Sequence, residues 1–210
     1  MVLQIIDKYF PRLNEAQRTK LIALLPVYTE WNQKINVISR KDMEFFYVHH
    51  VLHSLSLALF VQWPKGTKIL DLGCGGGFPG IPLAIFFPEV EFTLIDGTAK
   101  KIKVVNAVIE ELQLDNVQAF HSRAEELKLK YHFVISRAVA PLHQLLEWSN
   151  PLLLSKSIHA LPNGLIAYKG GDLKEELNNI PSHYFAESWP IREKISEEYF
   201  ETKYLVYVSS

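Results

Sequence analysis

The strongest chemical signal in the chain is a glycine-rich segment that runs from Asp71 to Gly80 and reads DLGCGGGFPG. Half of its ten residues are glycine, which suits positive φ and sites where a ligand lies against the main chain. A short apolar run precedes the segment, and Pro79 and Pro82 stand where a helix would begin. A strand, a glycine loop and a helix in this order predict a nucleotide-type cofactor site.

Two cofactor classes fit the loop, depending on which glycines are counted. The dinucleotide fingerprint G-x-G-x-x-G is formed by Gly75, Gly77 and Gly80, with Asp96 as a ribose-binding acid 16 residues later. The G-x-G-x-G pattern of S-adenosylmethionine (SAM) methyltransferases is formed by Gly73, Gly75 and Gly77. A glycine-rich turn that binds nothing is the third possibility.

Three features favour the SAM pattern. Asp71 places a carboxylate beside the loop, where it would attract a cationic ammonium or sulfonium and repel a pyrophosphate. Phe78 puts a bulky ring where the dinucleotide pattern needs room for phosphates. The chain after residue 96 is also short for the substrate domain of a dehydrogenase. We therefore expect SAM, with a nicotinamide dinucleotide as the alternative.

Three polar residues follow other apolar runs. Asp96 can accept both ribose hydroxyls, although it would also serve as a helix N-cap. Glu125 could take the adenine amino group, or be a solvated glutamate that the helix dipole favours. Arg137 stands where the reaction centre lies in this architecture, with a surface ion pair as the alternative.

The hydrophobic pattern predicts the elements that position these residues. Short apolar runs predict strands near residues 68–72, 91–96, 116–121, 132–136, 165–168 and 204–208, with helices at about 99–112 and after Pro141. Strands that alternate with helices predict an α/β, Rossmann-like, doubly wound and mostly parallel sheet. Ligands of such sheets bind at the carboxyl ends of the strands, where Asp96 and Arg137 fall.

Residues 1–66 contain helical patterns and no strand pattern. We expect an N-terminal helical cap over 1–66 and a SAM-binding domain over 67–210, together forming one compact unit. Asn14 and Gln17 predict a capping box, and Pro26 predicts a kink or restart because proline lacks the N–H donor. Further helices are expected from about residue 42 and over 50–61, before a turn at 64–66.

Composition excludes several classes of protein. The chain has 210 residues, of which 48% are hydrophobic, so a large core can form. No apolar run reaches the roughly 18–20 residues of a membrane helix, and the N-terminus resembles no secretory leader. The single cysteine, Cys74, excludes a disulfide framework and a Cys-cluster zinc site. We expect a cytoplasmic protein without metal or membrane association, and the helical cap suggests a monomer.

Charge is balanced over the whole chain but not along it. The net charge is -1, which by itself argues against nucleic acid. Residues 1–66 carry eight basic and five acidic residues, whereas residues 67–210 carry 14 basic and 18 acidic residues. This asymmetry leaves room for a basic face.

Several motifs together resemble the small-subunit ribosomal RNA methyltransferase G family, also called glucose-inhibited division protein B. They are WNQKIN at 31–36, HVLHSL at 50–55, DLG at 71–73, GFPGIP at 77–82, SRAE at 122–125, SRA at 136–138 and KG at 169–170. The resemblance spans nearly the whole chain. It implies a class I SAM-dependent fold and methylation of guanosine N7 in 16S ribosomal RNA, at the position conventionally numbered 527.

The resemblance also implies cofactor contacts, at Gly73, Gly75, Phe78, Asp96, Gly97, Thr98, Ala124, Glu125 and Arg137. Three departures from the family pattern concern RNA contacts: His53 in place of Asp, Cys74 in place of Ser or Thr, and a tail at 205–210 without a basic residue. A SAM-dependent methyltransferase of a small molecule or protein is the alternative function, and a nicotinamide oxidoreductase is the less favoured one.

RNA binding requires cations on one face. Candidates for phosphate contacts are Arg40, Lys41, Lys100, Lys101, Arg123 and Lys169, each of which could also be an ordinary surface charge. Trp31 and Trp148 could stack on bases, although burial in the core is expected for both. Because guanine N7 carries a lone pair and no proton, we expect no catalytic acid or base, and Arg137 as a positioning residue.

Overall fold

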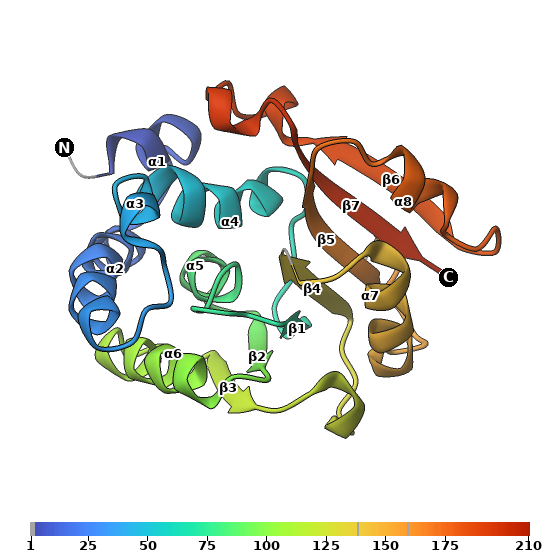
Figure 1. Cartoon of the computed structure of the whole chain (residues 1–210), viewed down its shortest axis with the longest axis horizontal. Coiled ribbons are helices and arrows are strands. Elements are labelled where there is room, and N and C mark those ends of the chain that lie inside the picture. The colour runs from blue at the N-terminus through green and yellow to red at the C-terminus, as the bar shows by residue number, and fades with distance from the viewer. Residues whose placement is uncertain (1–2, 138, 159) are drawn as a thin grey trace.

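The chain alternates helices and strands after an all-helical beginning (Figure 1). The structure is a computed structural model that describes residues 3–137, 139–158 and 160–210, so Ala138 of the SRA motif lies outside the described residues. The helices are α1 Gln4–Tyr9, α2 Glu15–Lys34, α3 Arg40–Met43, α4 His53–Leu55, α5 Gly80–Phe86, α6 Ala99–Glu111, α7 Leu142–Ser149 and α8 Lys174–Asn178. The strands are β1 Lys68–Leu72, β2 Glu91–Asp96, β3 Val117–His121, β4 Phe133–Arg137, β5 Gly164–Gly170, β6 Phe185–Pro190 and β7 Lys203–Ser209.

Shorter helical turns complete the chain. They are the π-helix η1 Phe46–Leu52 and the 3₁₀ turns η2 Ser56–Leu59, η3 Ala124–Glu126, η4 Asn150–Leu152, η5 Ile191–Glu193 and η6 Glu198–Phe200. No helix of the described residues is long and apolar enough to cross a membrane.

Seven strands form one sheet in the order β3-β2-β1-β4-β5-β7-β6. The first five run parallel, and β7 pairs antiparallel with both β5 and β6. The expected α/β, mostly parallel sheet is confirmed. The antiparallel β7, inserted between β5 and β6, separates this sheet from the dinucleotide-binding order 3-2-1-4-5-6.

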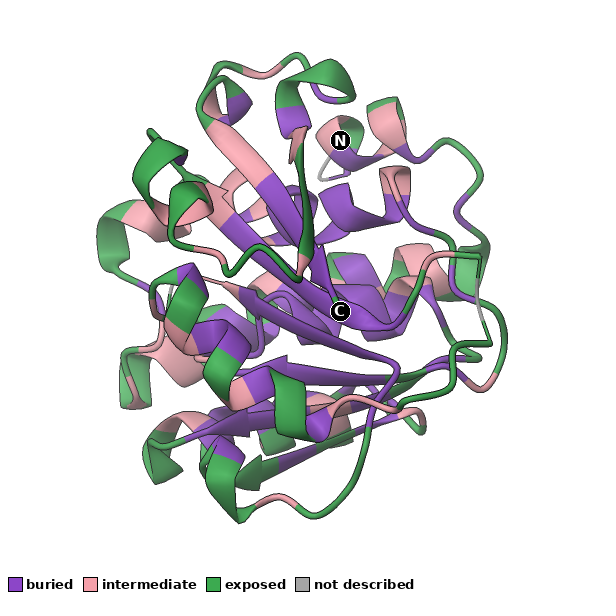
Figure 2. Ribbon diagram, turned by 90° about the vertical axis from the view of Figure 1, so that its right-hand side faces the viewer, coloured by how far each residue is buried: buried purple, intermediate pink, exposed green. Residues whose placement is uncertain are grey.

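Alternation along the strands divides the core between two faces. In β1, Ile69 packs with the cluster on one face and Leu70 with the cluster on the other. The first face is covered by the N-terminal helices with α5 and α6, and the second by α7 and α8 (Figure 1). Buried residues concentrate on the central strands in Figure 2, as expected of a sheet covered on both sides.

The first long helix departs from its prediction at one point. The capping box is confirmed, since Asn14 Oδ1 accepts from Gln17 N and Gln17 Oε1 accepts from Asn14 N. The restart at Pro26 was wrong, because α2 continues through it, and the kink stays a prediction. Proline removes the donor for the carbonyl of Ile22, and the hydroxyl of Tyr47 lies 3.2 Å from that carbonyl and 3.2 Å from the carbonyl of Leu21, so its proton is shared between them. The missing backbone bond is thus replaced from a neighbouring element.

Other differences lie outside the parallel core. The helix expected over 50–61 is divided among η1, α4 and η2. Strand β6 and helix α8 were not expected, because the exposed residues 185–188 of β6 show no hydrophobic alternation. The division at residue 66 stays a prediction, although one core cluster contains residues from both sides of it.

Candidate cofactor cleft and acceptor cavity

The glycine loop has the left-handed backbone that its composition predicts. Gly73 has φ of 74°, and a Cβ added there would lie 2.5 Å from Cγ1 of Val139. Gly77 has φ of 96°, and a Cβ there would lie 2.7 Å from Cγ1 of Ile81. Backbone conformation and the adjacent side chains therefore both require glycine at these two positions.

The N-terminal helices support this loop directly. Tyr28 of α2 donates its hydroxyl to the carbonyl of Gly76 at 2.5 Å, and its ring lies 4.9 Å from that of Phe78. Phe78 is 4% exposed and also packs against Phe46 and His50. The helical segment therefore helps to fix the loop's shape.

Asp71 lies beneath the loop instead of facing a ligand. Its Oδ2 accepts the backbone N–H of Gly80 at 2.8 Å, and its Oδ1 has no hydrogen-bond partner among the described residues. Burial raises the pKa of Asp71 to about 7, although the Gly80 bond opposes this shift. The expectation of a carboxylate in reach of the cofactor is not met, because Asp71 lines neither cavity described below.

Asp96 links the loop to the end of β2. Its Oδ2 accepts from Gly75 N at 3.0 Å, and its Oδ1 accepts from Thr98 N at 2.8 Å. Thr98, not Asp96, is the N-cap residue of α6. Each carboxylate oxygen keeps a free lone pair, so the pair can still accept two hydroxyl groups.

A cleft of about 410 Å³ opens beside Asp96 at the carboxyl ends of β1 and β2. Six of the expected cofactor-binding residues line it: Gly73, Asp96, Gly97, Thr98, Ala124 and Glu125. The remaining lining residues are Leu72, Ile95, Ser122, Arg123, Val139 and Trp148. Carboxylates stand at two places along mostly apolar walls, which suits a nucleoside with hydroxyl and amino groups.

Three expected cofactor residues do not line this cleft. The backbone N–H of Gly75 donates to Asp96, but Gly75 itself does not line the cleft, and Phe78 is buried behind the loop. Arg137, at the end of β4, lines a second cavity of about 320 Å³. Val139, two residues further along the chain, lines the first cleft, so both spaces lie near the carboxyl end of β4.

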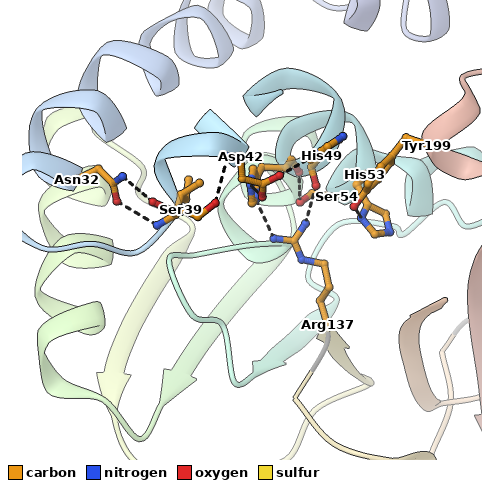
Figure 3. A network of polar contacts seen from close by, with 10 residues as sticks. Asn32, Ser39, Asp42, His49, His53, Ser54, Arg137 and Tyr199 are labelled. Atoms are coloured by element: carbon orange, nitrogen blue, oxygen red, sulfur yellow. Dashed lines mark hydrogen bonds and ion pairs between the residues drawn. The ribbon is translucent and has the colours of Figure 1, made fainter. Parts of the chain in front are cut away.

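The second cavity contains a cluster of histidines that sequence reasoning did not identify as a site. Asp42 accepts from Nδ1 of His49 and from Nε2 of His50, both at 2.6 Å. Arg137 donates to the carbonyl of His49 at 3.2 Å, and it lies 3.3 Å from Nδ1 of His50. Figure 3 shows Arg137 reaching from β4 toward the segment that carries these residues.

The electrostatics of this cluster favour a neutral His50 beside the cation of Arg137. Burial and then the charge of Arg137 lower the pKa of His50 to about 4. Partial burial raises the pKa of Asp42, but the bonds from both histidines outweigh it and hold that pKa below its usual value. No described residue forms an ion pair with Arg137, so its charge is balanced only at longer range.

The expected RNA-binding cations do not form one set. Arg40, Lys41 and Lys100 are exposed, and Arg123 lies at the mouth of the first cleft. Lys101 Nζ lies 3.9 Å from Asp96 Oδ2. Lys169 is bound to Glu176 at 2.7 Å and to the carbonyl of Ala140, with 11% of its side chain exposed, so it is poorly placed for a phosphate.

Two further expectations concern tryptophan and metal. Trp31 and Trp148 are each half-buried and pack against the core clusters, so the expected burial is met in part, and Trp148 also lines the first cleft. Among the described residues, no three His, Cys, Asp or Glu side chains are arranged to hold a metal ion.

The chain is similar over almost its full length to characterised families and proteins. A family model described as rRNA small subunit methyltransferase G matches residues 17–194. The ribosomal RNA small subunit methyltransferase G of Phocaeicola vulgatus is 48% identical, over 99% of this chain and 98% of that protein. The protein of the same description from Bacteroides thetaiotaomicron is 50% identical, over 98% of each chain.

Solved structures show the same fold at low sequence identity. A putative rRNA methylase from Clostridium thermocellum has a TM-score of 0.52 at 14% identity, covering 77% of this chain and 96% of that one. A mutant of MtNAS in complex with S-adenosylmethionine has a TM-score of 0.58 at 14% identity, covering 92% of this chain and 75% of that one. These likenesses support the fold alone.

Proposed function

The chain belongs to the rRNA small subunit methyltransferase G family, and from this premise we propose that it transfers the methyl group of SAM to N7 of a guanosine in 16S ribosomal RNA. The observation that carries the proposal is the cleft beside Asp96, which combines a glycine loop, a ribose-type acid and apolar walls. The antiparallel β7 argues further against the nicotinamide alternative.

The residues of the first cleft fit a bound SAM molecule. Asp96 holds two backbone N–H groups and has a free lone pair on each oxygen for ribose hydroxyls. Ala124 and Ile95 provide apolar surface for a flat base, and Glu125 is exposed at the rim for an amino group. Gly73 lines the cleft at the end of β1, where the amino-acid part of SAM would lie.

SAM supplies an electrophilic methyl group on a cationic sulfur, and the chain supplies its orientation. In the reaction, guanine N7 forms a bond to the methyl carbon, the carbon–sulfur bond breaks, and its electron pair returns to sulfur. N7 has no proton to lose, so no general base is required. The residues accelerate the reaction by holding the lone pair, carbon and sulfur in line.

Arg137 is assigned a positioning role. A hydrogen bond from Arg137 to N7 would occupy the attacking lone pair and slow transfer. Guanine O6, on the same edge of the base, is a good acceptor for arginine. Arg137→Ala should weaken RNA binding more than it slows single-turnover transfer in the bound state. A collapse of that rate with both affinities intact would contradict this role.

The fine RNA contacts belong to the same proposal. Arg40 and Lys41 on α3 are exposed and can contact phosphates, together with Lys100 and with Arg123 at the cleft. We place the enzyme in the cytoplasm as a monomer that acts on the small ribosomal subunit or its RNA.

Two measurements test the proposed function. Calorimetric titration should show binding of SAM and no comparable binding of NAD. Mass spectrometry of 16S ribosomal RNA should find one 7-methylguanosine missing in cells that lack the protein. Unchanged ribosomal RNA together with SAM binding would instead favour a small-molecule or protein substrate.

A further inference from the structure

The second cavity shares no lining residue with the cofactor cleft. It is enclosed by the ends of β4 and β5, by the segment that carries Asp42, His49 and His50, and by Tyr199. Its volume of about 320 Å³ is within the usual range for small-ligand sites. Arg137 at the end of β4 lines the cavity and Val139 lines the cleft, so both spaces lie near the carboxyl end of β4.

A buried nitrogen in this cavity lacks a partner. His53 is 6% exposed and lines the cavity, and its Nε2 has no hydrogen-bond partner among the described residues. Burial and then the charge of Arg137 lower the pKa of His53 well below its usual value, so the ring is neutral. Its Nδ1 lies 3.3 Å from the hydroxyl of Tyr199 (Figure 3). We assign that hydroxyl as the donor to Nδ1, which places the ring proton on Nε2.

The cavity therefore offers one unpaired donor, Nε2–H of His53, and the guanidinium of Arg137, which bonds the His49 carbonyl and His50 Nδ1 and has further N–H groups to donate. An unpaired buried donor costs about 1–3 kcal/mol, which is recovered when a ligand supplies an acceptor. An acceptor that lies between the two donors is favoured, whereas a donor in the same place is repelled. The site is thus chemically selective for a carbonyl-type oxygen.

One wall of the cavity is a column of stacked rings. The rings of His49 and Tyr199 lie 4.0 Å apart at 18°, and Phe45 stacks on the other side of His49 at 4.8 Å and 17°. Lys203 lies over Tyr199, and Phe45 is 47% exposed. Flat faces next to cations are surfaces on which unpaired bases stack.

We propose that this cavity receives the target guanine itself, turned out of the RNA stack, with its O6 bonded by His53 and Arg137. The inference rests on the proposed function and adds where the acceptor base binds and how it is recognised. Enzymes that act on a base commonly extrude it into such a pocket. Bonds to O6 leave the adjacent N7 free to face the cofactor cleft. Adenine carries an amino group in place of O6, so both donors would oppose it.

The test places base analogues at the target position of 16S ribosomal RNA by ligation and measures kcat/KM with the whole protein. Inosine keeps O6 and N7 and should react within about tenfold of guanosine. 2-Aminopurine keeps N7 but lacks O6, and its kcat/KM should fall about 100-fold or more. This comparison uses the unmodified protein, so it does not depend on the folding of any variant.

A variant tests the residue. His53→Phe keeps a ring among Tyr168 and Phe200 but removes the donor, so it should lower kcat/KM for guanosine by about 10-fold to 100-fold. The variant should change kcat/KM for the 2-aminopurine substrate little, because the bond to O6 is already absent there. Affinity for S-adenosylhomocysteine, the cofactor product, should stay within about twofold. His183→Phe, at an exposed histidine outside the cavity, is the matched control and should leave every value unchanged.

The outcomes separate the two proposals. If the wild-type protein methylates no guanosine in 16S ribosomal RNA, the proposed function fails, and this inference with it. If it methylates guanosine but accepts 2-aminopurine as readily as inosine, only the cavity assignment is overturned. Equal losses for both bases in His53→Phe would likewise overturn the role of His53.

Discussion

Replacing Asp96 with asparagine separates a ligand-binding role from a purely structural one. The carboxylate accepts two backbone bonds, from Gly75 N at 3.0 Å and Thr98 N at 2.8 Å. The asparagine side chain has only one oxygen. Its NH₂ group must therefore face either one of these two backbone N–H donors or the cleft. The variant therefore loses one backbone bond, and it also loses a charged acceptor for the ribose hydroxyls.

The structure sets the size of both effects. A hydrogen bond to a charged group contributes about 1.5–3 kcal/mol, so losing one ribose bond and weakening the other should cost about 2–4 kcal/mol of binding free energy. This corresponds to roughly 30-fold to 1,000-fold weaker binding of SAM. The unpaired N–H should lower the free energy of unfolding by about 1–3 kcal/mol.

The assay is calorimetric titration of SAM and S-adenosylhomocysteine, with urea unfolding on the same samples. Asp115→Asn makes the same chemical change at an exposed residue away from the cleft and should alter neither quantity. If Asp96→Asn loses stability but binds both ligands within about threefold of the wild type, Asp96 only supports the loop, and the assignment of the cleft is refuted.

Three further predictions follow from other parts of the structure. Burial raises the folded-state pKa of Asp71 to about 7. The stability that Asp71 contributes is therefore present below about pH 4 and is lost as the pH rises through 7, and the free energy of unfolding falls by up to about 4 kcal/mol. Urea unfolding from pH 5 to 8 should show this loss in the wild type and not in Asp71→Asn, and parallel curves would contradict it. Tyr47→Phe should lower the free energy of unfolding by about 0.5–1 kcal/mol. The loss should be smaller in a Pro26→Ala background, because residue 26 then regains its N–H. Equal losses in both backgrounds would count against the replacement bond. RNA affinity should fall about 100-fold or more between 50 and 200 mM salt, and Lys41→Gln should make that dependence shallower; a flat response would argue against direct RNA binding.

The parallel core could be predicted because local pattern and global fold agree there. Each of the first five strands is a short apolar run between polar turns, and Asp96 and Arg137 end the strands that were expected to carry them. Gly73 was identifiable because its backbone needs a residue without a side chain. These signals are local, so a single sequence contains them.

The second cavity could not be predicted because its parts are distant in sequence. His53 and Tyr199 are 146 residues apart, and their contact depends on how η6 packs against the N-terminal helices. The π-helix η1, which presents His49 and His50 to Arg137, has no distinct sequence pattern. The helix through Pro26 was missed for the same reason, since the bond from Tyr47 comes from a different element.

The most direct test of the central claim is methyl transfer in vitro. The purified protein is incubated with methyl-labelled SAM and small-subunit RNA from cells that lack the protein, and the RNA nucleosides are identified by mass spectrometry. Label is expected in a single 7-methylguanosine of 16S ribosomal RNA, at a level that approaches one methyl group per molecule. No labelled nucleoside, or label on an atom other than N7, would contradict this claim.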